Sequence, residues 1–357
     1  MSVAQHKALI LESKLGQFAV KTVQTPKPGP EEVLVKIEAT ALNPLDWKVQ
    51  ALGILIERYP TILGFDAAGS IFQIGEEVPP TLFAVGDRVL VQGWFDLAEQ
   101  SAHGTFTQYF LLPYKLVAKI PDSLAYEDAA TIPTGVATAG FPLYNQNESA
   151  ASVRLTPPWV KGGRGKYAGR PILVIGGASS MGQFAIQFAR LSGFSPIVTT
   201  ASPHNTPLLQ TLGATHVLDR KLSSEELIAE ATKITGGPFE VVYDAIASEE
   251  TSSMAYAVTA RGGHLVTVLS NPALELRAKE EGKNVDFVHG VFKSEVNRDI
   301  GRSLLDALPG LLKSGDIKPN RTEILPGGLN GVVEGLERLK NDQVSGVKLV
   351  VRPQETA

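Results

Sequence analysis

The sequence predicts an α/β protein in which a strand-rich, barrel-like region precedes a doubly wound parallel sheet. Three observations support this fold class. Roughly the first 120 residues alternate strand patterns with turns, whereas from Pro171 onward short apolar runs alternate with helical segments. Between the first of those runs and its helix lies a turn of small residues. With 357 residues, the chain is long enough for two domains with separate cores.

The N-terminal strands show the alternation of half-buried antiparallel sheets. In residues 31–40 (EEVLVKIEAT) the apolar side chains Val33, Val35 and Ile37 alternate with charged ones. Residues 86–92 and 104–113 each begin with glycine and continue as strand patterns. We therefore expect an antiparallel, barrel-like domain. The stretch 145–170, rich in Pro, Gly and basic residues, predicts a solvated surface loop, with a lid over the substrate as the alternative.

The second half of the chain predicts buried parallel strands joined by helices. Such strands are short apolar runs, and their alternation with helices such as 223–234 implies right-handed crossovers. The tail then returns to mixed structure, with a helix in 299–315 and a last strand in 346–353. The predicted strands of the parallel sheet are 171–175, 196–200, 215–218, 239–245 and 263–269.

Composition excludes several classes of protein. The net charge of −4 argues against a nucleic-acid binder, and no apolar run approaches the ~18 residues that span a bilayer. The chain has no cysteine, so disulfides, thiolate ligands and cysteine nucleophiles are excluded, and its six histidines show no metal-like spacing. We expect a cytoplasmic enzyme for a small-molecule substrate, without a metal, a nucleic-acid partner or a membrane.

The turn after the first parallel strand, VIGGASSMGQFAIQ (174–187), predicts a dinucleotide site. Small residues fill positions 176–180, and the helix that follows has Met181 and Phe184 on one face. A helix N-terminus offers unpaired N–H groups, and small residues let a pyrophosphate approach them. Gly182 lets the helix pack closely on the sheet. Ser179 stands where a third glycine is common, and we expect its hydroxyl to act as a donor.

The end of the second parallel strand favours NADPH over NADH. NAD sites usually place a carboxylate there for the ribose diol, but the segment 196–205 contains no acid. Ser202 followed by Pro203 predicts a helix N-cap. Together with His204 and Asn205, the cap would surround a 2′-phosphate. No Arg or Lys lies nearby in the sequence.

The chain resembles the medium-chain dehydrogenase/reductase superfamily over nearly its full length. The resemblance implies a Rossmann domain (136–291) inserted into a discontinuous GroES-like catalytic domain (1–135 and 292–357). The motifs that carry it, in the order typical of the superfamily, are NPLDWK, GFDAAG, GDRV, GTFTQY, AATIPTGVATA, the turn at Gly176, LGATHVLD and GGHLVTV.

Within the superfamily, the resemblance is to the zinc-free branch of quinone oxidoreductases and enoyl reductases, most of all to fungal trans-acting enoyl reductases. Zinc-dependent alcohol dehydrogenases place Cys where Asn43 stands and His-Glu where Phe65 and Asp66 stand. A metal site made of histidines and carboxylates alone is the alternative to a metal-free site.

The resemblance places Lys48, Thr134 and Thr138 at the nicotinamide and substrate, and Ser179, Ser180, Ser202, His204 and Asn205 at the NADP phosphates. The complete predicted cofactor set is Asp46, Gly176, Gly177, Ser179, Ser180, Met181, Gly182, Ser202, His204, Asn205, Val268 and Lys348.

Each candidate catalytic residue also has a structural interpretation. Lys48 would hold a carbonyl or ribose oxygen, or be a solvated lysine; Thr138 would contact the carboxamide or cap a helix. Asp46 fits a local backbone cap. Two tyrosines are possible proton donors or packing residues, and two aromatic residues could line an apolar pocket or the core. These four are Tyr59, Tyr144, Trp94 and Phe95.

A metal-free site favours reduction of an activated C=C bond. Zinc normally stabilises the alkoxide formed from a simple ketone, whereas an enolate spreads its charge and needs only a few donors. We therefore expect NADPH-dependent reduction of an enone, enal or enoyl thioester. The alternatives are a quinone oxidoreductase and a non-catalytic NADPH-binding sensor or accessory protein. A polyketide synthase is a candidate partner, and the chain would be a monomer or homodimer.

Overall fold

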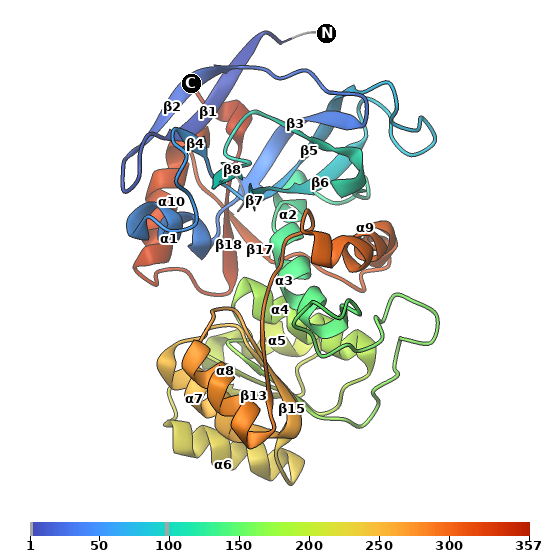
Figure 1. Cartoon of the computed structure of the whole chain (residues 1–357), viewed down its shortest axis with the longest axis vertical. Helices are drawn as coiled ribbons and strands as arrows, with labels where there is room; N and C mark the ends of the chain where they lie inside the picture. The colour runs from blue at the N-terminus through green and yellow to red at the C-terminus, as the bar shows by residue number, and fades with distance from the viewer. Residues whose placement is uncertain (1–2, 97–99) are drawn as a thin grey trace. The chain divides into compact units, whose positions relative to one another are not determined.

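The computed structural model describes residues 3–96 and 100–357, which divide into two compact units (Figure 1). Unit 1 comprises Met1–Thr134, Leu308–Lys313 and Pro319–Ala357. Unit 2 comprises Gly135–Ala307 and Ser314–Lys318. The first boundary thus lies beside the predicted one at 135/136, whereas the return to unit 1 comes after Ala307 rather than after residue 291.

Unit 1 is built mainly from antiparallel strands. Its largest sheet has the order β10-β6-β5-β3-β18-β17, with β9 also paired to β3, and β2-β1-β4 and β7-β8 form two smaller sheets. The strands are β1 (Gln5–Leu11), β2 (Phe18–Gln24), β3 (Glu32–Ala41), β4 (Thr61–Ile62), β5 (Asp66–Ile74), β6 (Arg88–Gln92), β7 (Trp94–Asp96), β8 (Ser101–His103), β9 (Tyr109–Pro113), β10 (Val117–Lys119), β17 (Arg321–Ile324) and β18 (Val347–Val351). The helices are α1 (Pro44–Leu52), α2 (Tyr126–Ala129) and α10 (Gly331–Lys340).

The C-terminal segment of the chain completes the sheet of unit 1. Strand β18 pairs antiparallel with β3, where Val350 lies opposite Ala41, and parallel with β17. One core joins the two ends of the chain, since Leu9 and Val49 pack with Val332 and Leu349. The prediction of a discontinuous barrel-like domain is therefore confirmed.

Unit 2 contains a six-stranded, all-parallel sheet in the order β13-β12-β11-β14-β15-β16. Its strands are β11 (Ile172–Ile175), β12 (Ile197–Ala201), β13 (His216–Asp219), β14 (Phe239–Asp244), β15 (Thr259–Thr267) and β16 (Asn284–Phe287). This order is that of a doubly wound Rossmann sheet, so the predicted fold class is confirmed. The predicted strands did not include β16.

Helices cover both faces of this sheet (Figure 1). Apolar residues of α6, α7 and α8, among them Leu227, Met254 and Ala278, pack in one cluster on the sheet, and α4 packs against β11, β12 and β14. The helices are α4 (Ser180–Ser192), α5 (Thr206–Leu212), α6 (Ser224–Thr235), α7 (Glu249–Val258) and α8 (Pro272–Glu281). Two further helices, α3 (Pro133–Tyr144) and α9 (Arg298–Lys313), each contribute residues to both units.

The irregular stretch 145–170 contains no helix or strand, as predicted, but it is more firmly attached than a solvated loop. The side chains of Leu155 and Tyr167 are buried. Backbone N–H groups of Val153 and Leu155 donate to the carbonyls of Pro142 and Leu143 in α3. The apolar residues within this polar segment explain why it packs on unit 2.

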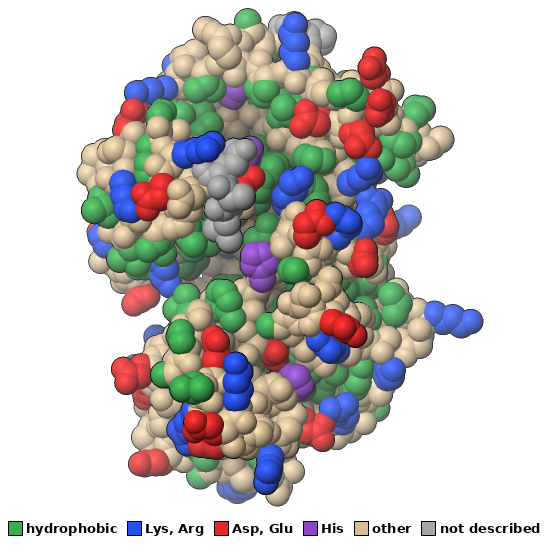
Figure 2. Space-filling view, viewed as in Figure 1, with side chains coloured by type: hydrophobic (Ala, Val, Ile, Leu, Met, Phe, Trp, Pro, Cys, Tyr) green, Lys and Arg blue, Asp and Glu red, His purple; other side chains and the backbone are tan. Residues whose placement is uncertain are grey.

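The described residues include no helix that is both long and apolar enough to cross a membrane. On the face drawn in Figure 2, acidic and basic side chains are interspersed. This matches the nearly balanced totals of 33 basic and 37 acidic residues.

Candidate functional site

The glycine-rich turn lies between β11 and α4, where close packing requires its glycines. Gly176 has a φ of +74°, a conformation that favours glycine. A Cβ on Gly177 would lie 2.0 Å from Thr199 Oγ1, and one on Gly182 would lie 2.3 Å from the carbonyl oxygen of Gly176. The backbone at the start of α4 is therefore bare, as a phosphate site at a helix N-terminus needs.

Ser179 is the N-cap residue of α4. Its Oγ accepts a hydrogen bond from the N–H of Gly182 at 3.1 Å, which fixes the first turn of the helix. The side chain thus acts as an acceptor within the protein, and its role as a donor to a ligand stays a prediction. Ser180 and Met181 follow it, half-buried, in the first turn.

Ser202 is the N-cap residue of a 3₁₀ turn with Pro203 at its start, as predicted, but its side chain makes no capping hydrogen bond. A 3₁₀ turn, η2 (Pro203–Asn205), follows it, and α5 begins only at Thr206. Instead, Ser202 Oγ accepts a hydrogen bond of 2.9 Å from Nε of Arg220. Of its neighbours, His204 is exposed and Asn205 is buried. The sequence next to Ser202 contains no Arg or Lys. Arg220, which directly follows the neighbouring strand β13, supplies the cationic group instead.

Arg220 reaches this position because β12 and β13 are parallel neighbours. In their register Ala201 lies opposite Asp219, and the N–H of Arg220 donates to the carbonyl of Ala201 at 3.0 Å. The carboxyl ends of the two strands therefore meet. The guanidinium stands beside the end of β12, where dinucleotide-binding sheets hold the adenosine ribose. A signal existed in the sequence, since an arginine lies two residues after the end of the predicted strand at 215–218.

The carboxyl end of β14 supports the glycine turn, a role that the sequence did not reveal. The Asp244 carboxylate accepts hydrogen bonds from the N–H groups of Ile246 and Ala247 and from the hydroxyls of Thr251 and Ser252, at 2.9–3.2 Å. Burial raises its pKa, and these hydrogen bonds oppose the rise. This loop places Ile246 so close to Gly176 that a Cβ there would lie 2.5 Å from Ile246 Cδ1.

The predicted cofactor residues of unit 2 gather at one edge of its sheet. β11, β12, β14 and β15 are parallel, and their carboxyl ends lead into the turn at Gly176, the segment 202–205, the Asp244 loop and Val268. Ligands of open α/β sheets bind at this edge, where the strand order reverses. The reversal falls at β11, between β12 and β14.

Thr138 lies inside α3, one turn after its start, which corrects the expectation of a helix-start residue. Its carbonyl accepts a hydrogen bond from the Tyr243 hydroxyl at 2.9 Å. A Cβ on Gly290 would lie 2.4 Å from Thr138 Oγ1. The bare backbone at Gly290 therefore lets the segment after β16 lie directly against the threonine hydroxyl.

A buried polar cluster occupies unit 1 around Asp66. Lys348 Nζ donates to Asn43 Oδ1 at 2.6 Å and to Asp66 Oδ2 at 3.1 Å, and Asn43 Nδ2 donates to the same Asp66 oxygen at 2.9 Å. Asp66 Oδ1 accepts the backbone N–H of Thr134 at 2.6 Å. Gln92 Nε2 donates to Thr134 Oγ1 at 3.3 Å. The cluster joins two predicted site residues, Lys348 and Thr134, from distant parts of the chain.

Asp46 has a local structural role beside this cluster. Its carboxylate accepts the N–H of Asn43 at 2.8 Å and the N–H of Gly64 at 3.1 Å, and the side chain is fully buried. Burial raises the pKa of Asp46 to about 7, against the lowering effect of these hydrogen bonds. The capping interpretation accounts for both oxygen atoms, so we assign Asp46 to the support of α1 rather than to direct contact with the cofactor.

This raised pKa predicts a pH-dependent stability. Between pH 4 and 7 the folded chain keeps a proton on Asp46 that the unfolded chain has released, so raising the pH favours unfolding. Relative to Asp46→Asn, the wild-type free energy of unfolding should fall across this range and level off above about pH 7. Urea denaturation of both proteins at several pH values measures the difference. If the free energy of unfolding depends on pH in the same way for both proteins, the assignment is wrong.

Lys48 and Thr134 occupy different environments in unit 1. Lys48 lies half-buried on α1, with Nζ 5.8 Å from the ring centre of Trp47. Within residues 3–96 and 100–357 its ammonium makes no hydrogen bond or ion pair. Thr134 is held at the start of α3 by Asp66 and Gln92.

The two candidate tyrosines fit packing roles. Tyr144 is fully buried, and its hydroxyl contacts Ser192 Oγ at 2.7 Å and the carbonyl of Phe188 at 3.2 Å. Burial raises its pKa, which opposes proton release. Tyr59 packs on the core of unit 1 and donates to the carbonyl of Ile56 at 3.3 Å. Tyr144 is therefore excluded as a proton donor to substrate.

The two candidate aromatic residues differ in burial. Trp94 is buried, stacked on His103 with a ring-centre distance of 4.7 Å. Phe95 is half-buried and contacts Phe65 at a ring-centre distance of 4.5 Å. Trp94 thus has the core role that the sequence left open.

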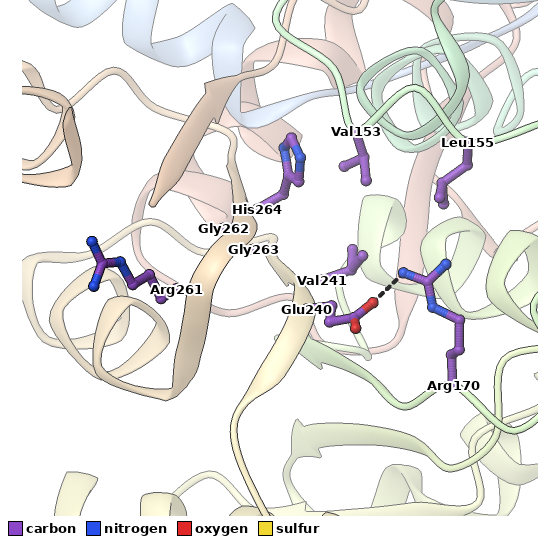
Figure 3. A pocket seen from close by; sticks show the side chains of 9 residues that line it. All are labelled: Val153, Leu155, Arg170, Glu240, Val241, Arg261, Gly262, Gly263 and His264. Atoms are coloured by element: carbon purple, nitrogen blue, oxygen red, sulfur yellow. Dashed lines mark hydrogen bonds and ion pairs between the residues drawn. The ribbon is translucent and has the colours of Figure 1, made fainter. Parts of the chain in front are cut away.

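Two hollows of unit 2 are lined by neither the turn at Gly176 nor the segment 202–205. One, of about 350 Å³, is lined by residues at the beginnings of β14 and β15, where Figure 3 shows Arg170 directed at Glu240 and Arg261 directed away from His264. It therefore belongs to the opposite edge of the sheet. The other, of about 380 Å³, lies between α3 and the segment after β16, with Phe141 and His289 among its lining residues.

Comparison with known proteins agrees with this architecture. Residues 29–122 match the alcohol dehydrogenase GroES-like domain, and residues 180–277 match the family described as zinc-binding dehydrogenase. Over 324 residues, covering 90% of this chain and 89% of the relative, the chain is 35% identical to the trans-enoyl reductase himH of Aspergillus japonicus. The chain belongs to the medium-chain dehydrogenase/reductase superfamily.

Other members of this superfamily resemble the chain over similar lengths. The trans-enoyl reductase traG of Penicillium crustosum is 30% identical over 369 residues, covering 97% of this chain and 96% of the relative. Among solved structures, the quinone oxidoreductase from Coxiella burnetii is 22% identical, with a TM-score of 0.75 and coverage of 98% and 99% of the two chains. At this level of identity, the similarity to the Coxiella burnetii structure shows the fold alone.

The residues of this medium-chain reductase do not fit a catalytic zinc ion. At the two positions where zinc-dependent relatives carry ligands it has Asn43 and the Phe65-Asp66 pair, and its sequence has no cysteine. The oxygens of Asn43 and Asp66 already hold the ammonium of Lys348, which would repel a dication. Within the described part of the chain, no three His, Asp or Glu residues cluster as metal ligands would.

Proposed function

We propose that the chain is an NADPH-dependent, zinc-independent reductase of C=C bonds conjugated to a carbonyl group: an enone, an enal or an enoyl thioester. The observation that carries this proposal is the 35% identity, over nine-tenths of the chain, to a trans-enoyl reductase. The chemistry of the site supports it, since the proposed donors are threonine hydroxyls and the ammonium of Lys48 rather than a metal ion. Such donors suit an enolate, whose charge is delocalised, better than an alkoxide.

NADPH is the cofactor that the sheet edge of unit 2 fits best. Ser202, His204 and Arg220 provide a hydroxyl, an imidazole and a guanidinium at the end of β12, where no carboxylate follows the strand. A guanidinium pairs well with a phosphate dianion. The bare backbone of Gly176, Gly177 and Gly182 and the first turn of α4 would hold the pyrophosphate. When bound, the reduced nicotinamide supplies the hydride.

Lys48, Thr134 and Thr138 are the proposed contacts with nicotinamide and substrate. The ammonium of Lys48 has no acidic partner within the described residues, so it is available to donate to a carbonyl or ribose oxygen. The hydroxyls of the two threonines lie on α3; the first accepts from Gln92, and the second is buried against the backbone of Gly290. Donors to the substrate carbonyl oxygen stabilise the enolate, and its carbon then takes a proton from a side chain or water.

Single substitutions test these assignments. We expect Lys48→Ala and Thr138→Ala each to lower kcat/KM for an enone at saturating NADPH by about tenfold to a hundredfold, because each removes a donor to developing charge. Lys14→Ala removes a surface lysine paired with Glu57 and serves as the control, with unchanged kinetics. If both site variants keep wild-type kcat and KM, the assignment is wrong.

The reaction itself is tested by following NADPH absorbance with acceptors of different chemistry. We expect turnover with an enoyl thioester or enone, and a preference for NADPH over NADH. Faster turnover with naphthoquinone or benzoquinone than with any enone or thioester would instead identify a quinone oxidoreductase. Tight NADPH binding without oxidation by any acceptor would identify a non-catalytic sensor or accessory protein.

The proposed substrate is an acyl chain carried as a thioester by a polyketide synthase, in the cytoplasm. The relatives named trans-enoyl reductases support this class of partner. Comparing one enoyl group on an isolated carrier protein and on a small thiol tests it. A higher kcat/KM for the carrier-bound form is the expected result, and equal values would favour a free small-molecule substrate.

A further inference from the structure

Two side chains from the N-terminal part of the chain hold the ammonium group of a C-terminal lysine inside unit 1. Lys348 on β18 donates to Asn43, which precedes α1, and to Asp66 at the start of β5. The exposed fractions are 5% for Lys348, 7% for Asn43 and 0% for Asp66. Asn43 lies 305 positions before Lys348 in the sequence, and Asp66 lies 282 positions before it. Such an enclosure is built by the fold and is unlike a surface ion pair.

Asn43 Oδ1 and Asp66 Oδ2 bind the ammonium of Lys348 as the oxygen ligands of a cation site would bind a free ion. Asn43 presents its amide oxygen to the ammonium and its Nδ2 to the carboxylate, so its orientation is fixed from both sides. Asp66 uses one oxygen for Lys348 and Asn43 and the other for the N–H of Thr134. A buried carboxylate without its cation is strongly destabilising, whereas the complete set satisfies both charges.

The carboxylate at the centre of this site also holds the start of α3. Its second oxygen accepts the N–H of Thr134 at 2.6 Å, in the first turn of the helix. The Thr134 hydroxyl in turn accepts from Gln92, and it contacts the carbonyl of Phe65 at 3.5 Å. The ammonium holds the Asp66 side chain in place, and Asp66 sets the position of Thr134.

We propose that Asn43 and Asp66 form a buried site for a monovalent cation, that the ammonium of Lys348 is its resident ion, and that the filled site positions the first turn of α3. Lys348 and Asp66 are then positioning residues that act through Thr134, and the chain's own ammonium stands in place of a metal ion. The consequence for catalysis rests on the proposed function, but the cation site itself does not.

The proposal predicts chemical rescue of Lys348→Ala. This variant lacks three carbons and the ammonium, which together correspond to n-propylammonium. We expect the variant to have a lower Tm than the wild type. n-Propylammonium at ten times its Kd should raise the Tm of the variant by about 3 °C, with no effect on the wild type. Neutral 1-propanol and the bulky tetramethylammonium ion, at the same concentration and ionic strength, should not.

Lys14→Ala is the matched control. It removes the same group from an ion pair with Glu57 of 2.6 Å, but both of these side chains are about half exposed. Propylammonium should leave its Tm unchanged. If propylammonium and 1-propanol stabilise Lys348→Ala equally, or if the amine stabilises both lysine variants equally, the proposed site is wrong.

A second pair of variants keeps the test decisive if Lys348→Ala does not fold. Lys348→Met leaves the buried Asp66 carboxylate without a cation, whereas the double variant Lys348→Met/Asp66→Asn removes both charges. We expect the double variant to have the higher Tm or, if Lys348→Met gives no folded protein, to be the one that folds. A double variant no more stable than Lys348→Met would overturn the proposal. Stoichiometric zinc in freshly purified wild-type protein would also overturn the proposal.

The link to α3 has readouts besides activity. In Asp66→Asn and Lys348→Ala, hydrogen exchange at the Thr134 amide should accelerate by at least about tenfold, the change expected for a lost hydrogen bond to a charged group. Propylammonium should restore slow exchange, and kcat, in Lys348→Ala. Unchanged exchange would overturn the positioning role. Absence of enoyl reduction in the wild type would instead disprove the proposed function and leave the thermal and exchange results to decide the cation site.

Discussion

Replacing Gly182 with alanine is expected to weaken NADPH binding by about 100-fold. The added Cβ would lie 2.3 Å from the carbonyl oxygen of Gly176 and 2.8 Å from Cα of Gly177, both backbone atoms that no rotamer change can move aside. The turn must therefore shift away from the start of α4. Loss of two charge-assisted hydrogen bonds to the pyrophosphate, at about 1.5 kcal/mol each, gives this factor. Calorimetric titration with NADPH measures it.

Gly237→Ala is the matched control for this substitution. Gly237 follows α6, it has no positive φ, and a Cβ there would meet no atom within 4 Å. This variant should bind NADPH as the wild type does. If Gly182→Ala remains folded, as judged by circular dichroism, and keeps wild-type affinity, the turn is not the pyrophosphate site.

Replacing Arg220 with alanine is expected to remove the preference for NADPH. The guanidinium lies beside Ser202 at the end of β12, and its loss should raise the Kd for NADPH by about tenfold to a hundredfold. The Kd for NADH should change by less than about threefold, because NADH has no 2′-phosphate. The ratio of the two constants is therefore the quantity to measure, and it should fall toward one. High salt should weaken NADPH binding in the wild type more than in the variant.

Arg261→Ala controls for the loss of one positive charge. Arg261 is exposed at the opposite edge of the same sheet, near the hollow of Figure 3. It should leave both constants unchanged. A tight NADPH complex in Arg220→Ala, or an equal loss of affinity for both coenzymes, would refute the assignment of the 2′-phosphate to this position.

The local features of the fold were predictable because their causes lie within short windows. The turn at Gly176 follows an apolar run and opens a helix, so its neighbours in sequence determine it. The alternation of apolar runs and helices likewise implies parallel strands. β16 was missed because its sequence, NVDF, has only two apolar residues, and it becomes a strand by pairing with β15, where Asn284 lies opposite His264.

The side-chain contacts within the candidate site were less predictable because they join segments that are distant in the sequence. Arg220 lies 18 positions after Ser202, and only the parallel pairing of β12 and β13 brings them together. Lys348 was predicted as a cofactor contact, but its pairing with Asp66 and Asn43 follows from β18 entering the sheet beside β3. Side-chain partners of this kind depend on strand order, which residue patterns alone do not determine.

Burial also decided roles that the sequence left open. Tyr144 and Trp94 had both a chemical and a packing interpretation, and the structure buries each among aromatic neighbours. Thr138 sits within α3 rather than at its start, because the helix already begins at Pro133. Proline at a first helical position is a start signal that the sequence contained.

We expect the pairing of Asp66 with Lys348 to delay the completion of unit 1 during synthesis. A ribosome releases Asp66 long before Lys348, 282 positions later in translation. Until then the nascent N-terminal strands lack both β18 and the only cation that this carboxylate contacts within the described residues. The six-stranded sheet of unit 2, whose strands all precede residue 288, can form first. We therefore expect the N-terminal strands of unit 1 to reach their final structure after unit 2.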